Sequence, residues 1–460
     1  LGFMLPYTPL HLLLTELAPG FPEVLVMTSG NLSEEPIAYQ DDDARQRLGE
    51  LTDAFLLHDR PIHMRVDDSV ARVVNEKPYL VRRARGYAPD SILLPLSTAP
   101  TLATGAELKN TFCLAREGYA FLSHHIGDLE NYETLRSFEE GIRHFERLFR
   151  VQPQRIACDL HPDYLATRYA QQRAQFEGLP ITAVQHHHAH LAACLADNGW
   201  PVDPKDTEPV IGLCFDGTGY GTDGAIWGGE VLLGGYQSFQ RRFHLAYVPL
   251  PGGDQAVRKP ARMALSHLWA AGIDWEPDLP PMQELCYEER TVLKAQMERK
   301  INAPLTSSMG RFFDAASALM GVRQKATYEG QAAIELETLA DPAETGFYPF
   351  EIHEDVIDPA PLWEALLANW RQGVTIPVLA ARFHNSVARL AVELCQKVHL
   401  EHGSAAAALS GGVWQNRYLL ERAVPALEKE GFRVLVHHQV PTNDGCIALG
   451  QVMVAAVNPL

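Results

Sequence analysis

A strand of the buried type runs straight into a glycine-rich turn in the middle of this chain. Residues 210–215 are almost continuously apolar, and they lead into Asp216-Gly-Thr-Gly-Tyr-Gly221. A second apolar run at 405–409 leads in the same way into Ser410-Gly-Gly412 and a helix. Glycines let backbone N–H groups approach phosphate oxygens, helix N-termini attract anions, and Asp216 can hold a magnesium ion. Either turn alone is a weak signal. Together they predict an α/β fold that holds a nucleotide between two lobes, with two similar halves as an open possibility.

The length of the chain bears on its domain organisation. Its 460 residues predict two or three units, since domains usually run to ~100–200 residues. Residues 1–92 look like part of an α/β domain, with a strand expected at 23–28 and a helix at 44–51. A proline-bearing, low-charge stretch at 93–99 is expected to be a linker. A larger domain then occupies residues 100–460.

Within the larger domain, the hydrophobic pattern predicts strands and helices in mixed order. The strands are expected at 101–106, 110–115, 119–123, 155–159, 210–215, 405–409 and 432–436. Helices are expected at 132–149 and 445–457, and residues 255–345 and 360–402 are expected to be mainly helical.

Composition argues against several classes of protein. The net charge of −18 disfavours a nucleic-acid surface, because proteins that bind phosphate backbones normally carry a basic face. No apolar run reaches the ~20 residues of a membrane helix. The seven cysteines form no Cys-x-x-Cys pair, and their odd number favours a reducing cytoplasm. The chain begins at Leu1 in the middle of a pattern, so we expect further residues before it.

The candidate metal ligands lie in Gln185-His-His-His-Ala-His190. His186 and His190 are four residues apart, so in a helix they share one face with Cβ atoms ~5–6 Å apart. That spacing suits one divalent metal ion, and His187 and His188 then point elsewhere. The alternative is a polar helix start with structural histidines. A histidine pair also needs a further ligand, which is commonly a carboxylate.

A candidate for that carboxylate lies near the C-terminus, in Val440-Pro-Thr-Asn-Asp-Gly-Cys446. Either Asn443 or Asp444 could simply cap the helix that follows. The sharper interpretation is that Asp444 ligates the metal together with the two histidines.

Two segments of the first domain could hold an anion. Thr28-Ser-Gly-Asn-Leu-Ser33 offers hydroxyls and backbone N–H groups, and Arg82-Arg-Ala-Arg-Gly86 offers guanidinium groups that bind phosphate through two hydrogen bonds. The alternatives are an ordinary turn and a solvated basic patch.

The motifs described above occur together, in this order along the chain, in one known combination of domains. Residues 1–92 resemble the C-terminal half of a YrdC-like domain, through Thr28-Ser-Gly-Asn31, Asp67-Asp-Ser69 and Arg82-Arg-Ala-Arg-Gly86. Residues 98–460 resemble the TsaD-like family, which has the two-lobed ASKHA (actin/hexokinase-like) fold. The motifs have the form that is typical of one branch, the HypF family of [NiFe]-hydrogenase maturation, which the chain resembles. They are Gln185-His-His-His-Ala-His190, Phe215-Asp-Gly-Thr-Gly-Tyr-Gly-Thr-Asp-Gly224, Trp227-Gly-Gly-Glu230, Ser410-Gly-Gly-Val-Trp-Gln-Asn416 and Asn443-Asp444.

The resemblance implies an ATP-dependent carbamoyltransferase. The YrdC-like domain would join carbamoyl phosphate and ATP, with magnesium, into carbamoyl-adenylate. The TsaD-like domain would pass the carbamoyl group to the C-terminal cysteine of the partner HypE and release AMP. The thiocarboxamide formed is the precursor of a cyanide ligand of the hydrogenase iron. HypF proteins begin with an acylphosphatase-like domain and a cysteine-rich zinc-binding region, and neither is in this chain. The first half of the YrdC-like domain is also outside it, so we expect the transfer step to survive more readily than adenylate formation.

The resemblance also implies roles for individual residues. His186, His190 and Asp444 would bind zinc or iron, with Asp216 as a further ligand, directly or through water, and as a catalytic group beside the two histidines. The residues expected to contact nucleotide are Gly217, Thr218, Gly219, Gly411, Gly412 and Asn416 in the larger domain, and Ser29, Asn31, Ser69 and Arg83 in the first.

Three other functions remain open at this point. A tRNA threonylcarbamoyl transferase would share the fold, but the net charge of −18 and the form of the 216–221 turn disfavour it. A nucleotide-binding ASKHA protein without a metal would have no use for the His186/His190 pair. A non-catalytic scaffold that docks HypE would tolerate the loss of both Asp216 and His190.

Overall fold

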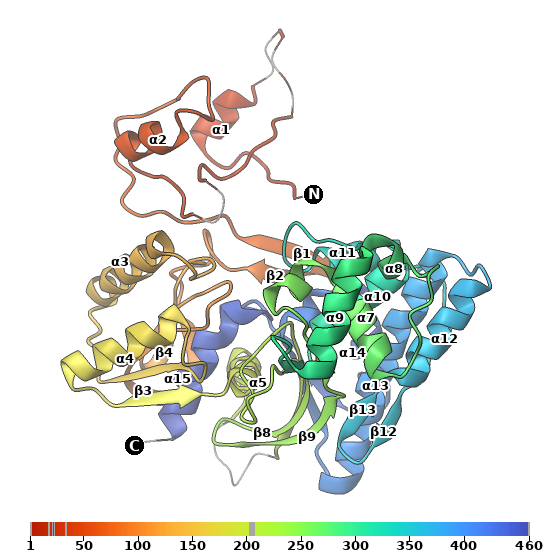
Figure 1. The fold of residues 1–460 in the computed structure, drawn as a ribbon. Coiled ribbons are helices and arrows are strands. Elements are labelled where there is room, and N and C mark those ends of the chain that lie inside the picture. Colours follow the sequence, from red (N-terminus) through yellow and green to blue (C-terminus); the bar gives the residue numbers. More distant parts are fainter. Residues whose placement is uncertain are drawn as a thin grey trace.

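The computed structural model describes residues 2–16, 19–20, 22, 24–32, 35–201 and 208–458. A small N-terminal segment stands apart from a larger body that contains two sheets, and the hairpin β1–β2 connects the two parts (Figure 1). Among the helices of the described residues, none combines the length and the apolar character that crossing a membrane requires.

The N-terminal segment contains little regular structure. It has the helices α1 (Pro9–Leu14) and α2 (Asp41–Leu48) and the antiparallel hairpin of β1 (Val70–Val74) and β2 (Lys77–Arg82). The helix expected at 44–51 is present as α2 and begins earlier.

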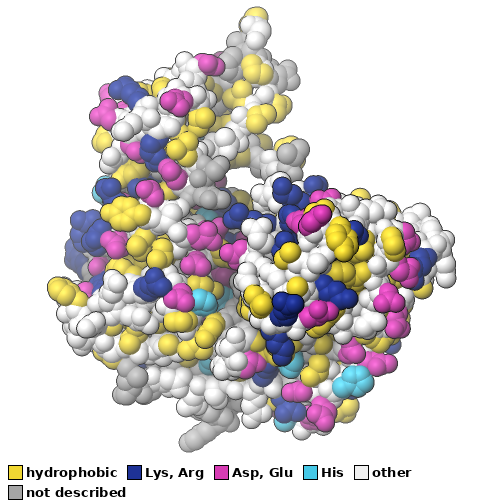
Figure 2. Space-filling model, in the orientation of Figure 1, with side chains coloured by type: hydrophobic (Ala, Val, Ile, Leu, Met, Phe, Trp, Pro, Cys, Tyr) yellow, Lys and Arg dark blue, Asp and Glu magenta, His cyan; other side chains and the backbone are white. Residues whose placement is uncertain are grey.

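The strand expected at 23–28 is wrong for residues 24–28, which form no strand, while Glu23 lies outside the described residues. A strand is stable only beside a partner, and among the described residues none pairs with this segment, so Val24 and Val26 remain exposed. Figure 2 shows hydrophobic side chains on the surface of the N-terminal segment.

The first lobe is built on a four-stranded sheet in the order β4-β3-β5-β6. Its strands are β3 (Ile92–Ala103), β4 (Cys113–Leu122), β5 (Arg155–Asp159) and β6 (Ile181–Val184), and its outer helices are α3 (Tyr132–Phe149) and α4 (Leu165–Glu177). The helix expected at 132–149 and the strand expected at 155–159 are confirmed residue for residue.

Residues 93–99 are not an irregular linker, because they belong to strand β3. The register with β4 shifts on both sides of Thr98, and such bulges accommodate the prolines of this strand, which cannot donate to the ladder. The three short strands expected between 101 and 123 are likewise the end of β3 and the single strand β4.

The second lobe is built on a seven-stranded sheet in the order β12-β13-β9-β8-β7-β14-β15. Its strands are β7 (Val210–Phe215), β8 (Gly229–Gly234), β9 (Phe239–Leu245), β12 (Glu351–His353), β13 (Val356–Asp358), β14 (Ala406–Ser410) and β15 (Arg433–Leu435). Strand β7 has the bounds expected for it, and the strands expected at 405–409 and 432–436 are present as β14 and β15.

The two sheets share one wiring pattern. In the first lobe β3 pairs antiparallel with β4 and parallel with β5, which pairs parallel with β6. In the second lobe β7 pairs antiparallel with β8 and parallel with β14, which pairs parallel with β15. The possibility of two similar halves is therefore confirmed, and so is the two-lobed α/β architecture.

Helices α5 (His186–Asp197) and α15 (Ile447–Val457) lie in the middle of the body and share one apolar core with strands of both sheets (Figure 1). The remaining helices lie mainly with the second lobe: α6 (Asp254–Arg258), α7 (Pro260–Ala270), α8 (Pro280–Glu284), α9 (Tyr287–Arg299), α10 (Met309–Leu319), α11 (Gln331–Leu339), α12 (Ala360–Arg371), α13 (Ile376–His402) and α14 (Arg417–Lys429). Short strands β10 (Val248–Pro249) and β11 (Leu305–Thr306) and 3-10 turns η1 (Gly412–Gln415) and η2 (Asp444–Cys446) complete the body. The expected mainly helical regions and the C-terminal helix are thus present.

Candidate functional site

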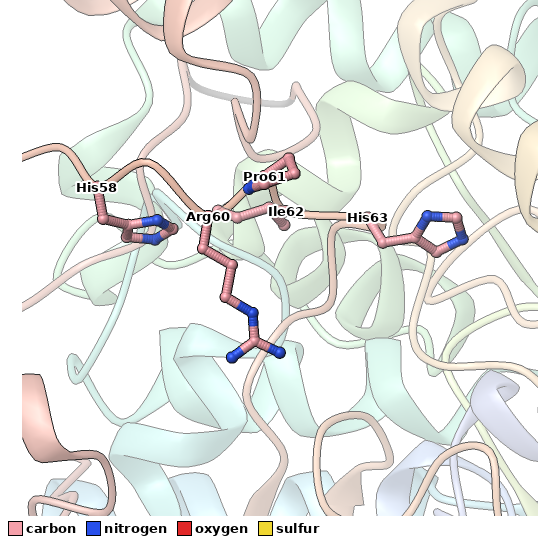
Figure 3. Close-up of a pocket in the computed structure, with 5 residues that line it drawn as sticks. All are labelled: His58, Arg60, Pro61, Ile62 and His63. Atoms are coloured by element: carbon pink, nitrogen blue, oxygen red, sulfur yellow. The ribbon is translucent and has the colours of Figure 1, made fainter.

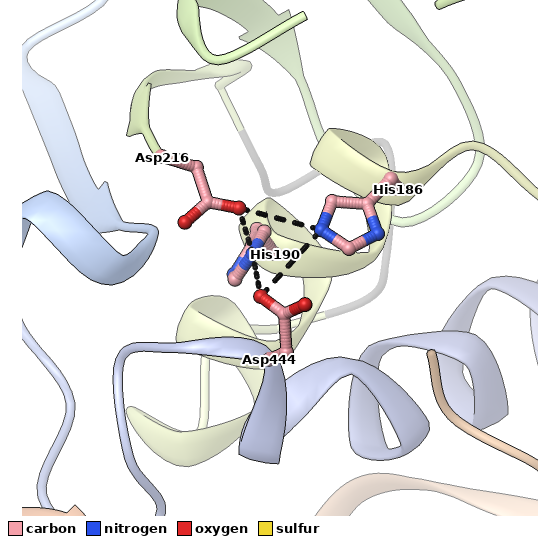
Figure 4. Close-up of side chains that lie close together, drawn as sticks. All are labelled: His186, His190, Asp216 and Asp444. Carbon is pink, nitrogen blue, oxygen red and sulfur yellow. Dashed lines mark ion pairs between the residues drawn. The ribbon is translucent and has the colours of Figure 1, made fainter. Parts of the chain in front are cut away.

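Four buried side chains meet where the two lobes join: His186, His190, Asp216 and Asp444 (Figure 4). One ligand atom of each lies within 4.8 Å of those of the other three. Oδ2 of Asp216 is 3.4 Å from Nε2 of each histidine, and Oδ1 of Asp444 is 3.7 Å from Nε2 of His186 and 3.6 Å from that of His190. The structure therefore brings together the four residues that the sequence singled out as metal ligands.

Local structure explains how each side chain reaches the cluster. Helix α5 begins at His186, because the side chain of Gln185 accepts a hydrogen bond from the N–H of His188 and caps the helix. His186 and His190 then lie one turn apart on the same face. Asp216 directly follows strand β7.

The C-terminal segment resolves which of two neighbouring residues is the cap. The side chain of Asn443 accepts a hydrogen bond from the N–H of Gly445 and caps η2. The side chain of Asp444 is consequently free to point into the cluster (Figure 4).

Three atoms of the cluster are buried without any hydrogen-bond partner among the described residues. They are Nε2 of His186, Nε2 of His190 and Oδ2 of Asp216. Leaving such atoms unsatisfied costs free energy, and atoms that converge on one point are explained by a shared cation. Four ligands held tetrahedrally at ~2.1 Å from a zinc ion are ~3.4 Å apart. The separations of 3.4 to 3.7 Å therefore fit a metal ion.

A second layer of hydrogen bonds orients the cluster. Nδ1 of His186 is 2.9 Å from Oδ2 of Asp159, and Nδ1 of His190 is 3.2 Å from Oγ of Ser410. With Nδ1 so engaged, each ring presents Nε2 to the centre, as metal-binding histidines commonly do. Oδ1 of Asp216 accepts a hydrogen bond of 2.7 Å from the N–H of Gly412.

Neither Asp159 nor the Ser410 hydroxyl was expected from the sequence to support the site. A signal for Asp159 existed, since it ends a predicted strand and ligand-binding residues gather at the carboxyl ends of parallel strands.

Opposite charges dominate the electrostatics of the cluster. Burial lowers the pKa of His186, but the carboxylates of Asp444 and Asp159 raise it well above its ordinary value. Burial raises the pKa of Asp216, but the two histidines beside it hold that pKa well below its ordinary value. The pKa of Asp444 is also lowered, because the histidines outweigh burial and the neighbouring Asp216. Two carboxylates thus stay ionised in a buried site, where they face the two histidines.

The other histidines of the motif behave differently. Nε2 of His188 lies 2.8 Å from the carbonyl oxygen of Gly235, away from the cluster, as expected. His187 is fully buried, and burial lowers its pKa well below the ordinary value. A Cβ added to Gly219 would lie 2.5 Å from Cε1 of His187, so the glycine-rich turn packs directly on this ring.

The second glycine-rich turn is engaged by the protein itself. The N–H of Gly411 donates to the carbonyl oxygen of Thr442, and that of Gly412 donates to Asp216. Gly411 has a φ of 107°, and a Cβ there would lie 2.2 Å from the carbonyl oxygen of Phe215, so only glycine fits.

Helix α14, which follows this turn, already has an anion at its N-terminus. The carboxylate of Glu337 accepts a hydrogen bond of 2.9 Å from the N–H of Arg417, and Arg72 of strand β1 pairs with the same carboxylate at 2.8 Å. Asn416 caps the helix by accepting from the N–H of Leu419. These contacts dock the N-terminal segment on the second lobe.

The side chains of the four residues expected to bind nucleotide in the first domain make hydrogen bonds within the protein. Arg83 is buried and donates to the carbonyl oxygens of Leu122, Tyr87 and Asp90. The hydroxyl of Ser69 bridges Ala84 N–H and the carbonyl oxygen of Arg85. Ser29 and Asn31 are hydrogen-bonded to each other. A hollow of about 350 Å³ in this segment is lined by none of the four but by His58, Arg60, Pro61, Ile62 and His63, whose polar side chains point in different directions (Figure 3).

Models of known families match most of the chain. Residues 1–84 match the Sua5_yciO_yrdC family, described as telomere recombination. Residues 97–197 match the HypF Kae1-like domain, and residues 212–451 match the second subdomain of the carbamoyltransferase Kae1-like domain.

Curated relatives agree with these matches. The carbamoyltransferase HypF of Rhodobacter capsulatus is 44% identical over 463 residues, an alignment that covers 99% of this chain and 60% of the relative. A carbamoyltransferase HypF homolog of Cupriavidus necator is 37% identical over 371 residues, which is 78% of this chain and 92% of that protein. Apart from this shorter homolog, the chain spans about three fifths of the length of the relatives it matches.

Solved structures show the same fold. A full-length HypF in its phosphate- and nucleotide-bound form superposes with a TM-score of 0.91 at 42% identity, covering 99% of this chain and 59% of that one. HypF of T. kodakarensis superposes with a TM-score of 0.85 at 31% identity, covering 94% of this chain and 57% of that one.

Proposed function

Because the chain belongs to the HypF family of carbamoyltransferases, we propose that it transfers a carbamoyl group from carbamoyl-adenylate to the C-terminal cysteine of HypE. The observation that carries this proposal is the buried His₂Asp₂ cluster, which directly adjoins the glycine-rich turn after strand β7. A metal site beside a turn suited to phosphate is what the departure of AMP requires.

The two parts of the chain would serve successive steps. Residues 1–92 would contribute to the formation of carbamoyl-adenylate from carbamoyl phosphate and ATP, with release of phosphate and pyrophosphate. Residues 100–460 would carry out the transfer. The linking strand β3 runs from one part into the other, so the two steps would take place on adjoining structures.

In the transfer step the cysteine thiolate of HypE attacks the carbonyl carbon of the adenylate. A sulfur–carbon bond forms, the bond from that carbon to the phosphate oxygen breaks, and AMP leaves with the electron pair. The thiol proton is lost to solvent before the attack. The attacking sulfur belongs to the partner, so the step needs no nucleophile from this chain.

His186, His190, Asp216 and Asp444 would hold a zinc or iron ion, since nitrogen and oxygen ligands suit both. Bound there, the ion would neutralise charge on the phosphate as AMP leaves. Within the chain, Asp159 and Ser410 orient the two histidines through their Nδ1 atoms, and the N–H of Gly412 orients Asp216 through its Oδ1. The burial of the cluster between two lobes would keep water from the acid-labile mixed anhydride.

The proposal is tested by giving the chain carbamoyl-adenylate and HypE and measuring the mass of the HypE C-terminal peptide. We expect a gain of one carbamoyl group with the wild type and none with His190→Ala. His188→Ala is the matched control, because its side chain lies on the same helix and contacts Gly235 rather than the cluster. Wild-type behaviour of His190→Ala would contradict the proposed role of the cluster.

Two further arms separate the alternatives. Modification of tRNA, when threonylcarbamoyl-adenylate and tRNA replace carbamoyl-adenylate and HypE, would identify a threonylcarbamoyl transferase. Binding of AMP without transfer to either acceptor would identify a non-catalytic nucleotide-binding protein. Repeating the assay with ATP and carbamoyl phosphate in place of the adenylate tests the first step separately.

A further inference from the structure

The glycine-rich turn after β7 presents three consecutive backbone N–H groups without a partner. Within the described part of the chain, the N–H groups of Gly217, Thr218 and Gly219 donate no hydrogen bond. Gly219 is buried and the other two are half-buried. The carbonyl oxygen of Gly219 in the same turn is engaged, since it accepts from the N–H of Trp227. Successive free N–H groups of this kind form a concave site for an anion.

Helix α10 is fixed against this turn. The hydroxyl of Ser308 donates to the carbonyl oxygen of Gly217 at 2.7 Å, and the N–H of Gly310 donates to that of Asp216 at 2.9 Å. A Cβ added to Gly310 would lie 2.9 Å from Cα of Gly217, so the helix and the turn pack backbone against backbone.

Arg311 follows at once and carries a buried guanidinium group with two unused nitrogens. The residue is 8% exposed. Its Nε donates to Oδ2 of Asp314 at 2.6 Å, whereas Nη1 and Nη2 make no hydrogen bond with any residue that the structure describes. Nη1 is the nearest atom to a Cβ built on Gly217, at 4.0 Å, so the unused side of the guanidinium faces the turn.

This arrangement leaves donors of the turn and of Arg311 available to a ligand. Arg311 is ion-paired through Nε with Asp314, so Nη1 and Nη2 are the donors it can offer. The N–H groups of the turn are likewise donors, so they cannot satisfy Arg311. An acceptor with several oxygen atoms and negative charge satisfies both sets of donors at once.

We propose that Arg311 binds the phosphate of the adenylate, together with the N–H groups of the 217–219 turn. This inference rests on the proposed function and adds to it a residue from a different element, helix α10. A guanidinium binds two phosphate oxygens in a planar fork, which fixes the orientation of the phosphate as well as its position. Because Asp216 immediately precedes Gly217, the bound phosphate lies next to the metal cluster, and the oxygen that bridges this phosphate to the carbamoyl carbon leaves as part of AMP.

The test compares two ligands that differ only in the phosphate. The dissociation constants of AMP and adenosine are measured by calorimetry for the wild type, Arg311→Met and Arg311→Lys. We expect Arg311→Met to bind AMP roughly ten- to hundredfold more weakly, the usual loss for a charged hydrogen-bonding group, and to bind adenosine as the wild type does. Arg311→Lys keeps the charge without the fork and should recover part of the loss.

Arg323→Met is the matched control, because its guanidinium pairs with Glu335 away from the turn and its side chain is 36% exposed. Equal losses for AMP and adenosine in Arg311→Met, or no loss for AMP, would overturn the inference. If circular dichroism shows that Arg311→Met is unfolded, the test rests on Arg311→Lys. A wild-type ratio of the AMP and adenosine dissociation constants in Arg311→Lys would then overturn the inference. A wild type that binds AMP no better than adenosine refutes the phosphate site alone, and one that binds neither refutes the proposed function as well.

Discussion

Replacing Gly450 by alanine should separate the two helices that carry the metal cluster. A Cβ at Gly450 of α15 would lie 1.9 Å from the carbonyl oxygen of Ala189 in α5 and 2.6 Å from its carbonyl carbon. A carbon and a carbonyl oxygen approach to about 3.3 Å at the closest, so the helices must part by roughly 1.4 Å at this contact. The atoms that clash belong to two backbones, and no side-chain rotation can relieve them.

The displacement acts directly on the cluster. Ala189 precedes His190, and α15 follows the turn that carries Asp444. Oδ1 of Asp444 is 3.6 Å from Nε2 of His190, and a shift of roughly 1.4 Å would widen this separation to about 5 Å. Two ligands that each lie ~2.1 Å from one ion can be at most ~4.2 Å apart. Asp444 and the histidines could then no longer hold the same ion.

The assay is a titration of the metal-free protein with zinc or cobalt, followed by thermal unfolding. We expect the Gly450→Ala variant to bind metal at least ten- to hundredfold more weakly, since loss of an outer partner alone has that effect. The free energy of unfolding should fall by about 1–3 kcal/mol from overpacking. Gly118→Ala is the control, because a Cβ there meets nothing within 4 Å. Wild-type metal affinity in a Gly450→Ala variant of lowered stability would refute the coupling between helix packing and the cluster.

Two further substitutions test electrostatics and docking. Burial and the carboxylate of Glu130 raise the pKa of Glu107 from 4.5 to about 7, so the folded state binds this proton more tightly than the unfolded state. Stability from this group is therefore present below pH 4.5 and is lost as the pH rises through 7. Since Glu107 is only half-buried, urea unfolding at pH 8 should show the Glu107→Gln variant to be more stable than the wild type by about 1–2 kcal/mol. A difference between variant and wild type that is the same at pH 4 and pH 8 would contradict this. Arg72→Met should lower the free energy of unfolding by about 2 kcal/mol, because the carboxylate of Glu337 is 6% exposed and would lose its cation. Adding Glu337→Gln should restore most of that loss, and a further drop in the double variant would argue against the ion pair.

Much of the fold could be predicted where local pattern and burial agree. Helix α3 and strand β7 have the expected bounds because an amphipathic period and a continuous apolar run each permit a single element. The expected strand at 23–28 failed because an apolar run does not show whether a neighbouring strand exists to pair with it. The stretch expected as a linker at 93–99 connects the two parts as a strand rather than as an irregular segment, because the bulges that carry its prolines depend on pairing with β4.

The candidate site, like the fold, could be predicted only in part from local sequence. His186 and His190 could be singled out because a four-residue spacing places them on one helix face, and metal chemistry made Asp444 a candidate third ligand beside its alternative as a cap. Asp216 joined this ligand set only through the resemblance to the HypF family. Of their supporting partners, Asp159 carries only the weak signal of its place at the end of a predicted strand. Asp159 reaches His186 only because β5 pairs with β6, the strand that leads into α5.

The same limit explains why both glycine-rich turns of the larger domain were expected to bind phosphate, although the structure uses their N–H groups differently. Both glycine-rich turns follow buried strands, and both looked equally suited to phosphate. In the structure the N–H groups of Gly411 and Gly412 are used by Thr442 and Asp216, and the helix after that turn binds Glu337. Within the described residues, the N–H groups of Gly217, Thr218 and Gly219 in the first turn donate no hydrogen bond, and the guanidinium of Arg311 from another element lies beside them. Whether a turn binds substrate or braces the fold is therefore decided by which tertiary neighbours have already taken its donors, and that information lies outside any local motif.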